Sequence, residues 1–296
     1  MGPRNGNVAS MNRTQQHSSL PISEDFTAPI TLPRMPGFAE APYQMLAGKL
    51  TRLLARNLPT KKLTMRNTRP LVSFTFDDAA ATACTVGAAL LEQCHTRGTF
   101  YVSGEKCGKP SPTGRLATIE QLKALHANGH EIACHTFSHT PVVGISRQAL
   151  ESDLDRNRLF LQGILGNIPI SNFAYPYGDI SFATKRYLGG RYDSCRALTP
   201  GVNADVADLG VLKSNALEQS STDRHGVSHL ITETVRRNGW LLFAIHDVND
   251  VPSQYGVRPE LLTFALRSAL AAGCRLVTVA HALCILRGEE PDGEAA

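Results

Sequence analysis

The sequence predicts an α/β fold in which about seven parallel strands curve into a single barrel-like domain. Short apolar segments rich in β-branched and aromatic residues alternate with segments whose apolar residues recur at helical spacing. Glycines stand just after four of the helical segments, at Gly98, Gly129, Gly239 and Gly273, where a left-handed helix end is common. This alternation is typical of βα units around a parallel sheet, and a doubly wound open sheet is the alternative.

The strand predictions rest on short runs bounded by turn residues. The runs LVSFTF and WLLFAI consist mostly of apolar or β-branched residues, as expected for strands covered on both faces. Most of the shorter runs carry aromatic or β-branched residues next to Gly, Asn or Asp. In chain order the predicted strands cover 71–77, 98–104, 130–135, 171–178, 194–198, 240–246 and 274–280.

The helix predictions fill most of the intervals between these strands. Leu, Ile or Ala recurs every three or four residues in them, with charged residues between. The predicted helices cover 80–95, 118–128, 146–165, 180–189, 225–238 and 258–272.

The first 67 residues differ in composition from the rest of the chain. Residues 1–40 are rich in Ser, Asn, Gln, Pro and Gly without periodicity, which predicts a flexible, disordered tail. Residues 41–67 place leucines at helical spacing with Lys or Arg between them, which predicts an amphipathic helical extension. Peripheral association of this extension with a membrane surface is an alternative interpretation. The folded domain is expected at 68–290, followed by a short tail at 291–296.

Composition excludes several classes of protein. Of the 296 residues, 42% are apolar and 19% charged, which is an ordinary globular balance. The net charge of +4 comes without a block of Lys and Arg, so no nucleic-acid partner is expected. The sequence has no run of about 18 uncharged apolar residues, so no transmembrane segment is expected.

Because the seven cysteines are odd in number and widely spaced and no signal peptide is seen, a cytoplasmic location is expected. Nothing in the sequence predicts the oligomeric state.

Polar residues capable of metal binding follow several predicted strands. Asp77 and Asp78 end the first strand, His135 and His139 lie at the end of the third, and His246 ends the sixth. The carboxyl ends of parallel strands meet at one face of such a domain, so these side chains are expected together. Two imidazoles and a carboxylate are a common ligand set for zinc or another divalent metal. Asp77 would then accept a proton from metal-bound water, and His246 would protonate a leaving group.

Each of these features has a simpler interpretation when taken alone. An acidic pair after a strand often caps a helix, and ten histidines make a chance HxxxH spacing common. His246 could be a core histidine at a strand end. The coincidence of all of them at the same ends of successive strands favours a functional site.

The order of the motifs FTFDD, HTFSH, FAYPYG and FAIHD, over roughly residues 68–290, resembles the polysaccharide deacetylase family, the NodB-type domain of carbohydrate esterase family four. The resemblance implies a deformed (β/α) barrel that removes acetyl groups from sugars in chitin oligomers, peptidoglycan or exopolysaccharides. The expected function is therefore metal-dependent hydrolysis of an amide bond, as in a chitooligosaccharide deacetylase, with an acetylated glycan as partner. The expected metal is zinc, with cobalt, nickel or manganese as alternatives.

The resemblance also assigns roles to residues of this chain. Asp77 matches the general base, and His246 matches the general acid that protonates the leaving amine. The metal ligands match Asp78, His135 and His139.

The FAYPYG motif matches the substrate groove. The backbone N–H of Tyr177 corresponds to the oxyanion donor, and Pro176, Tyr177 and Gly178 correspond to the groove wall. This motif usually begins with an Arg that hydrogen-bonds the base, and here that position is Ala174. We expect Arg196, in the next strand, to orient the base instead, with a structural arginine as the alternative.

Two further departures concern the remaining motifs. The family's fourth motif, an Asp followed closely by Asp-Trp, has no clear counterpart, and Ala244 stands where the family has a Leu two residues before the histidine. Two other functions stay open, and the changed third motif leaves room for the first of them. One is hydrolysis of a small non-sugar amide, ureide or imide on the same barrel, and the other is a non-catalytic carbohydrate-binding protein.

Overall fold

One sheet of eight strands forms the centre of the computed structural model, which describes residues 1–2 and 51–289. Its strands are β2 (Leu71–Phe76), β3 (Thr99–Val102), β6 (Glu131–Cys134), β7 (Asn172–Ala174), β8 (Ser194–Arg196), β10 (Asn215–Ala216), β11 (Trp240–Ile245) and β12 (Arg275–Leu276). They pair in the order β10-β11-β2-β3-β6-β7-β8, and β12 pairs with β2. Each of these pairs is parallel.

The two edges of this order are joined by the segment 212–216. Leu212 forms a parallel bridge with Arg196 of β8, and its N–H donates to the carbonyl of Cys195 at 2.7 Å. Further along the same segment, β10 pairs with β11 through Asn215 and Phe243. The strands therefore form the deformed parallel barrel that the sequence predicted.

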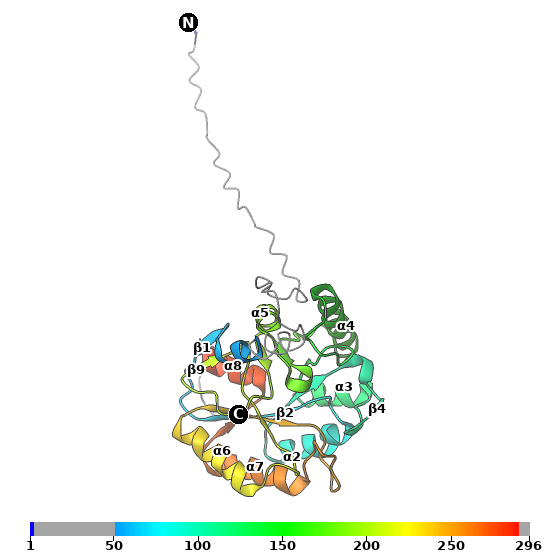
Figure 1. The fold of residues 1–296 in the computed structure, drawn as a ribbon, viewed down its shortest axis with the longest axis vertical. Helices are drawn as coiled ribbons and strands as arrows, with labels where there is room; N and C mark the ends of the chain where they lie inside the picture. Colours follow the sequence, from blue (N-terminus) through cyan, green and yellow to red (C-terminus); the bar gives the residue numbers. More distant parts are fainter. Residues whose placement is uncertain (3–50, 290–296) are drawn as a thin grey trace, which may run out of the picture.

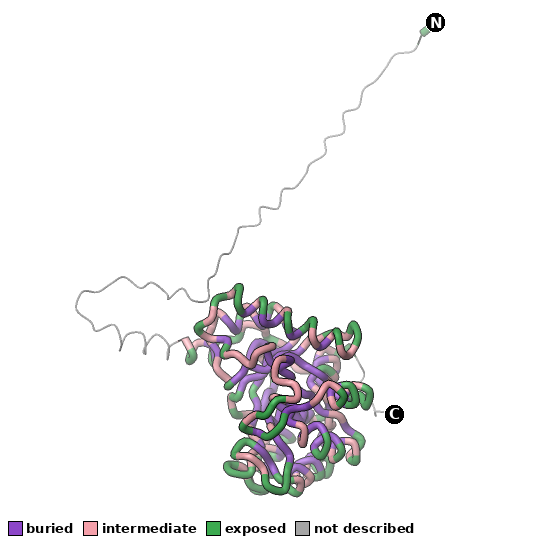
Figure 2. The backbone as a smooth tube through the Cα atoms, turned by 90° about the vertical axis from the view of Figure 1, so that its right-hand side faces the viewer, coloured by how far each residue is buried: buried purple, intermediate pink, exposed green. Residues whose placement is uncertain are grey.

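Helices form a layer around the strands (Figure 1). They are the π-helix η1 (Ala83–Gly87), α2 (Ala88–Gln93), α3 (Ile119–Ala127), α4 (Arg147–Leu165), α5 (Phe182–Arg191), α6 (Arg224–Arg236), α7 (Pro259–Ala271) and α8 (Val279–Arg287). Several begin at a side-chain cap that satisfies a free N–H of the first turn, such as Ser146 before α4. Figure 2 shows the buried residues in the interior and the exposed ones along the outer surface. None of the described helices is long and apolar enough to cross a membrane.

The central strands are buried along their whole length because helices cover them outside and side chains fill the barrel inside. Every residue of β2 and of β11 is buried. The rings of Phe76 and Phe100 stack with their centres 4.6 Å apart, and Phe74 and Phe243 stack at 5.3 Å. This packing fixes the strand ends from which the polar side chains project.

Some expected boundaries are wrong. The predicted strand 274–280 ends at Leu276, because Thr278 caps α8 by accepting the N–H of His281 at 3.2 Å. The predicted strand 171–178 ends at Ala174, and a 3-10 turn, Pro176–Gly178, follows it. The sequence analysis missed three pairing elements: β10, the antiparallel pair of β1 (Lys62–Thr64) with β9 (Val206–Asp208), and the hairpin of β4 (Pro110–Ser111) with β5 (Gly114–Arg115).

The expected extension 41–67 can be compared with the structure only from residue 51. Residues 51–57 are helical, whereas Lys62–Thr64 is a strand. Buried Lys185 ties this region to the barrel, because its Nζ donates to the carbonyls of Ala55 at 2.7 Å and Leu58 at 2.8 Å and pairs with Asp208 at 2.5 Å. Residues 3–50, which hold most of the expected tail, and the expected tail 291–296 lie outside the described residues.

Candidate metal centre and active site

Three side chains from two strand ends converge at the carboxyl edge of the barrel. Asp78 follows β2, and His135 and His139 follow β6. One ligand atom from each lies within 4.8 Å of the others. Oδ1 of Asp78 is 3.3 Å from Nε2 of His139 and 3.9 Å from Nε2 of His135. Sequence spacing predicted this proximity because strand ends in a parallel barrel share one face.

The other nitrogen of each imidazole already has a partner. Nδ1 of His135 donates to the carbonyl of Ala174 at 2.9 Å, and Nδ1 of His139 lies 3.1 Å from the hydroxyl of Tyr177. Both Nε2 atoms therefore face Asp78, whose buried Oδ1 has no hydrogen-bond partner within 51–289. Imidazoles oriented in this way by an outer hydrogen bond are characteristic of metal ligands. The donor set fits a divalent cation such as zinc.

The electrostatic environment keeps His135 in the form that binds a cation. Burial lowers the pKa of His135 to about 4, although Asp77 and Asp78 oppose this effect. At neutral pH the imidazole is therefore uncharged, and its Nε2 lone pair is available.

Asp77 and Arg196 form a buried ion pair beside these ligands. Asp77 is 3% exposed and Arg196 is fully buried, and Nη2 of Arg196 donates to Oδ1 of Asp77. Burial raises the pKa of Asp77, but Arg196, together with His135 and His246, more than offsets this and lowers it to about 2. The carboxylate is therefore ionised and held in one orientation.

Tyr101, which the sequence analysis did not single out, covers the arginine. Its fully buried ring lies 5.0 Å from the guanidinium carbon of Arg196, close enough for a cation–π interaction. The same ring clusters with Ala133 and Ala174, whose small side chains leave room for it. No sequence pattern indicates this contact, because the residues come from four different strands.

His246 reaches the site from β11. It lies close enough to Asp77 to affect that residue's pKa, and its ring centre is 5.5 Å from that of Tyr255. Its Nδ1 is buried, and no hydrogen-bond partner for it occurs in the described part of the chain.

The third motif, Pro176–Gly178, lies at the rim of the site. The Tyr177 side chain is 65% exposed, and its ring packs edge-on against His139 at 4.7 Å. Its backbone is left-handed, with φ of 59°. The following Gly178 also has a positive φ, and a side chain there would crowd Leu198.

Backbone strain is concentrated around the same residues. Eight described residues other than glycine have positive φ values, and five of them lie at this site: Asp78, Ala79, Thr136, His139 and Tyr177. A left-handed conformation costs such residues about 1–2 kcal/mol each. Strain of this kind persists where the surrounding structure holds it and clusters at functional sites. It therefore favours a site over the interpretation of the acidic pair as a simple helix cap.

Asp153 supports the histidine loop, and the sequence analysis missed it. From α4, its buried carboxylate accepts the backbone N–H groups of Phe137 at 2.6 Å and Ser138 at 3.2 Å, and the Ser138 hydroxyl at 2.5 Å. The available signal was a polar residue at a position of the helix that the apolar stripe otherwise occupies, between Leu150 and Leu154.

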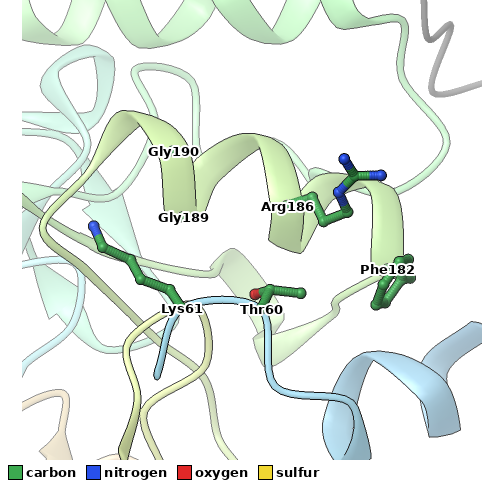
Figure 3. Close-up of a pocket in the computed structure, with 6 residues that line it drawn as sticks. All are labelled: Thr60, Lys61, Phe182, Arg186, Gly189 and Gly190. Carbon is green, nitrogen blue, oxygen red and sulfur yellow. The ribbon is translucent and has the colours of Figure 1, made fainter. Parts of the chain in front are cut away.

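A separate pocket of about 480 Å³ lies against α5 (Figure 3). It is lined by Thr60, Lys61, Phe182, Arg186, Gly189 and Gly190. None of the predicted site residues contributes to it, so it belongs to a different part of the surface.

Comparison with known proteins points to one family. Residues 64–189 match the family model described as Polysaccharide deacetylase. A chitin deacetylase of Colletotrichum lindemuthianum is 23% identical over 227 residues, which cover 72% of this chain and 82% of that protein. Chitin deacetylase 1 of Cryptococcus neoformans var. grubii is 26% identical over 105 residues, or 36% of this chain. The chain spans only 20% of the Cryptococcus protein and 38% of a matching chitin deacetylase from Pestalotiopsis.

Solved structures share the fold. A family 4 acetyl xylan esterase from Clostridium thermocellum, in complex with a cobalt ion, matches with a TM-score of 0.53 and 21% identity over 75% of this chain and 93% of that one. A family 4 carbohydrate esterase from Bacillus subtilis matches with a TM-score of 0.52 and 15% identity over 81% of this chain and 89% of that one. Its barrel, its ordered motifs and the match over residues 64–189 make the chain similar to the polysaccharide deacetylase family.

Proposed function

We propose that the chain is a metal-dependent hydrolase that removes the N-acetyl groups of N-acetylglucosamine units in an oligo- or polysaccharide. One observation carries the proposal. Asp78, His135 and His139 converge on one point, and Asp77 is held ionised beside them by Arg196. The family and the chitin deacetylases among the relatives support an acetylated glycan as the substrate class.

The metal would be held by Asp78 and by Nε2 of His135 and of His139. When bound, a divalent cation supplies a Lewis acid for the acetyl carbonyl and lowers the pKa of water. Zinc suits two imidazoles and a carboxylate, and cobalt, nickel and manganese are the alternatives.

The protein's own groups carry the proton transfers. Asp77 accepts a proton from the attacking water, and Arg196 orients the carboxylate without taking that proton because its guanidinium stays charged. The backbone N–H of Tyr177 donates to the oxyanion that develops on the acetyl oxygen. His246 donates a proton to the leaving nitrogen, so that the amine departs uncharged.

The test is release of acetate by the zinc-loaded full chain from N-acetylglucosamine oligomers. We expect acetate release that a chelator abolishes and added zinc restores. Asp77→Asn should lower kcat by about 100-fold or more, because general-base catalysis is lost. Glu260→Gln, which neutralises an exposed carboxylate on α7, is the matched control and should leave kcat unchanged. Folded protein that binds zinc at this site but releases no acetate from any acetylated sugar would exclude the proposal.

A further inference from the structure

Tyr255 is a partly exposed aromatic residue next to the proposed proton donor. It lies on the loop that follows β11, is 40% exposed, and packs its ring against His246 at 5.5 Å with an angle of 45° between the rings. Tyr177 likewise packs its ring against a histidine of the site, edge-on against His139 with the ring centres 4.7 Å apart. In the sheet, the strands β11-β2-β3-β6-β7 are neighbours in this order. Tyr255 follows β11 and Tyr177 follows β7, whereas Asp77 and the proposed metal ligands follow β2 and β6, which lie between them.

The loop that carries Tyr255 is held by a buried carboxylate. Asp247 is 3% exposed and accepts the backbone N–H of Ser253 at 2.9 Å and its hydroxyl at 2.5 Å. The backbone N–H of Tyr255 in turn donates to the Ser253 hydroxyl at 3.2 Å. A Cβ at Gly256 would lie 2.3–2.5 Å from the Asp247 carboxylate, so only glycine allows this close approach.

The residues on both sides of Tyr255 are hydrogen-bonded to a second segment, residues 219–220. The N–H of Gln219 donates to the carbonyl of Gly256 at 2.8 Å, and the hydroxyl of Ser220 donates to the carbonyl of Gln254 at 2.9 Å. The backbone of Tyr255 is therefore fixed on each side, while its ring remains accessible. A ring placed in this way contacts a ligand with little loss of conformational entropy.

We propose that Tyr255 is a specificity-determining residue that stacks its ring on a sugar ring at the leaving-group side of the substrate. A pyranose has an apolar C–H face and a polar rim, and an aromatic ring offers a matching apolar face. Because His246 reaches the leaving nitrogen, the ring beside His246 faces the sugar that carries this nitrogen. The inference rests on the proposed function and adds that the ring of the sugar unit bearing the leaving nitrogen contributes to productive binding.

The test compares a sugar substrate with an acetyl ester that has no ring. The zinc-loaded full chain and its variants are assayed with the N-acetylglucosamine trimer and with triacetin. Tyr255→Ala should lower the ratio of kcat/KM for the trimer to kcat/KM for triacetin by about tenfold, mainly through KM. Tyr255→Phe and Tyr255→Trp should keep this ratio within about twofold of wild type, because they retain the ring. Val251→Ala, at an 84% exposed position of the same loop, is the matched control.

The outcomes separate this inference from the proposed function. A wild-type ratio in Tyr255→Ala, in protein that melts at the wild-type temperature, would overturn the stacking role. A loss in Tyr255→Phe as large as that in Tyr255→Ala would also overturn it, because the hydroxyl and not the ring would then matter. If the wild-type chain hydrolyses triacetin but no acetylated sugar, the proposed function fails, and the role of Tyr255 fails with it.

Discussion

Replacing Arg196 with alanine should both destabilise the protein and raise the pKa of Asp77. The arginine side chain is fully buried, and its Nη2 donates to a carboxylate that is itself only 3% exposed. The substitution leaves that carboxylate buried without its countercharge. Breaking one side of a buried ion pair costs about 3–5 kcal/mol.

The pKa of Asp77 gives a second measure of the same interaction. Burial alone would raise this pKa, but Arg196, with smaller contributions from His135 and His246, lowers it from 3.8 to about 2. Because the folded-state pKa is lowered, the associated stability is present above about pH 3.8 and is lost as the pH falls through about 2. It amounts to about 2 kcal/mol in the metal-free protein. Without Arg196 the effect of burial prevails, so the pKa of Asp77 rises and the loss of stability moves to higher pH.

Urea unfolding of the chelated full chain at pH 7, and again toward pH 3, measures both effects. Arg196→Ala should lower the free energy of unfolding by about 3–5 kcal/mol at pH 7. In an Asp77→Asn background the same replacement should cost less, because no charge is left unpaired. Arg236→Ala removes a 67% exposed partner of Glu233 and should cost under about 1 kcal/mol. An equal cost of Arg196→Ala in both backgrounds, or a cost no larger than that of Arg236→Ala, would refute the buried-pair argument.

Two further substitutions test the supports of the site and of the N-terminal region. Asp153→Ala should weaken zinc affinity by about 10–100-fold in a competition titration, because the histidine loop loses its acceptor, while Glu151→Ala on the same helix should not. An unchanged affinity in Asp153→Ala would show that the loop holds its shape unaided. Lys185→Met leaves the Asp208 carboxylate without its countercharge and should lower the free energy of unfolding by about 3 kcal/mol. A melting temperature equal to that of wild type would contradict this.

The sequence predicts the fold best where an element is long and strongly patterned. The strands β2 and β11 consist mostly of apolar residues, and their observed ends lie within a residue of those expected. The elements that were missed or wrongly assigned are short. A two-residue strand such as β10 has no periodicity, and it forms because segment 212–216 fills the gap between β8 and β11. Residues 277–280 read as a strand from their β-branched side chains, whereas the cap at Thr278 starts a helix.

For the site, the sequence predicts the residues that lie at strand ends and misses the residues whose contacts position them. The proximity of Asp78, His135 and His139 follows from strand order, which periodicity reveals. Asp153 and Tyr101 act through contacts between distant parts of the chain. Such contacts depend on how helices and strands pack, and no local pattern records that packing.

Arg196 lies on the strand next to the position where the resemblance to the family leads one to expect an arginine. The resemblance to the family leads one to expect an arginine at position 174, where the chain has alanine. In the sheet, Ala174 of β7 and Arg196 of β8 are directly paired neighbours in parallel register. Side chains of paired residues in neighbouring parallel strands point to the same face. An arginine at either position would therefore project from the same face of the sheet and at the same height along the strands. The small side chain of Ala174 and the ring of Tyr101 leave room for the guanidinium of Arg196 to reach Asp77 from the neighbouring strand.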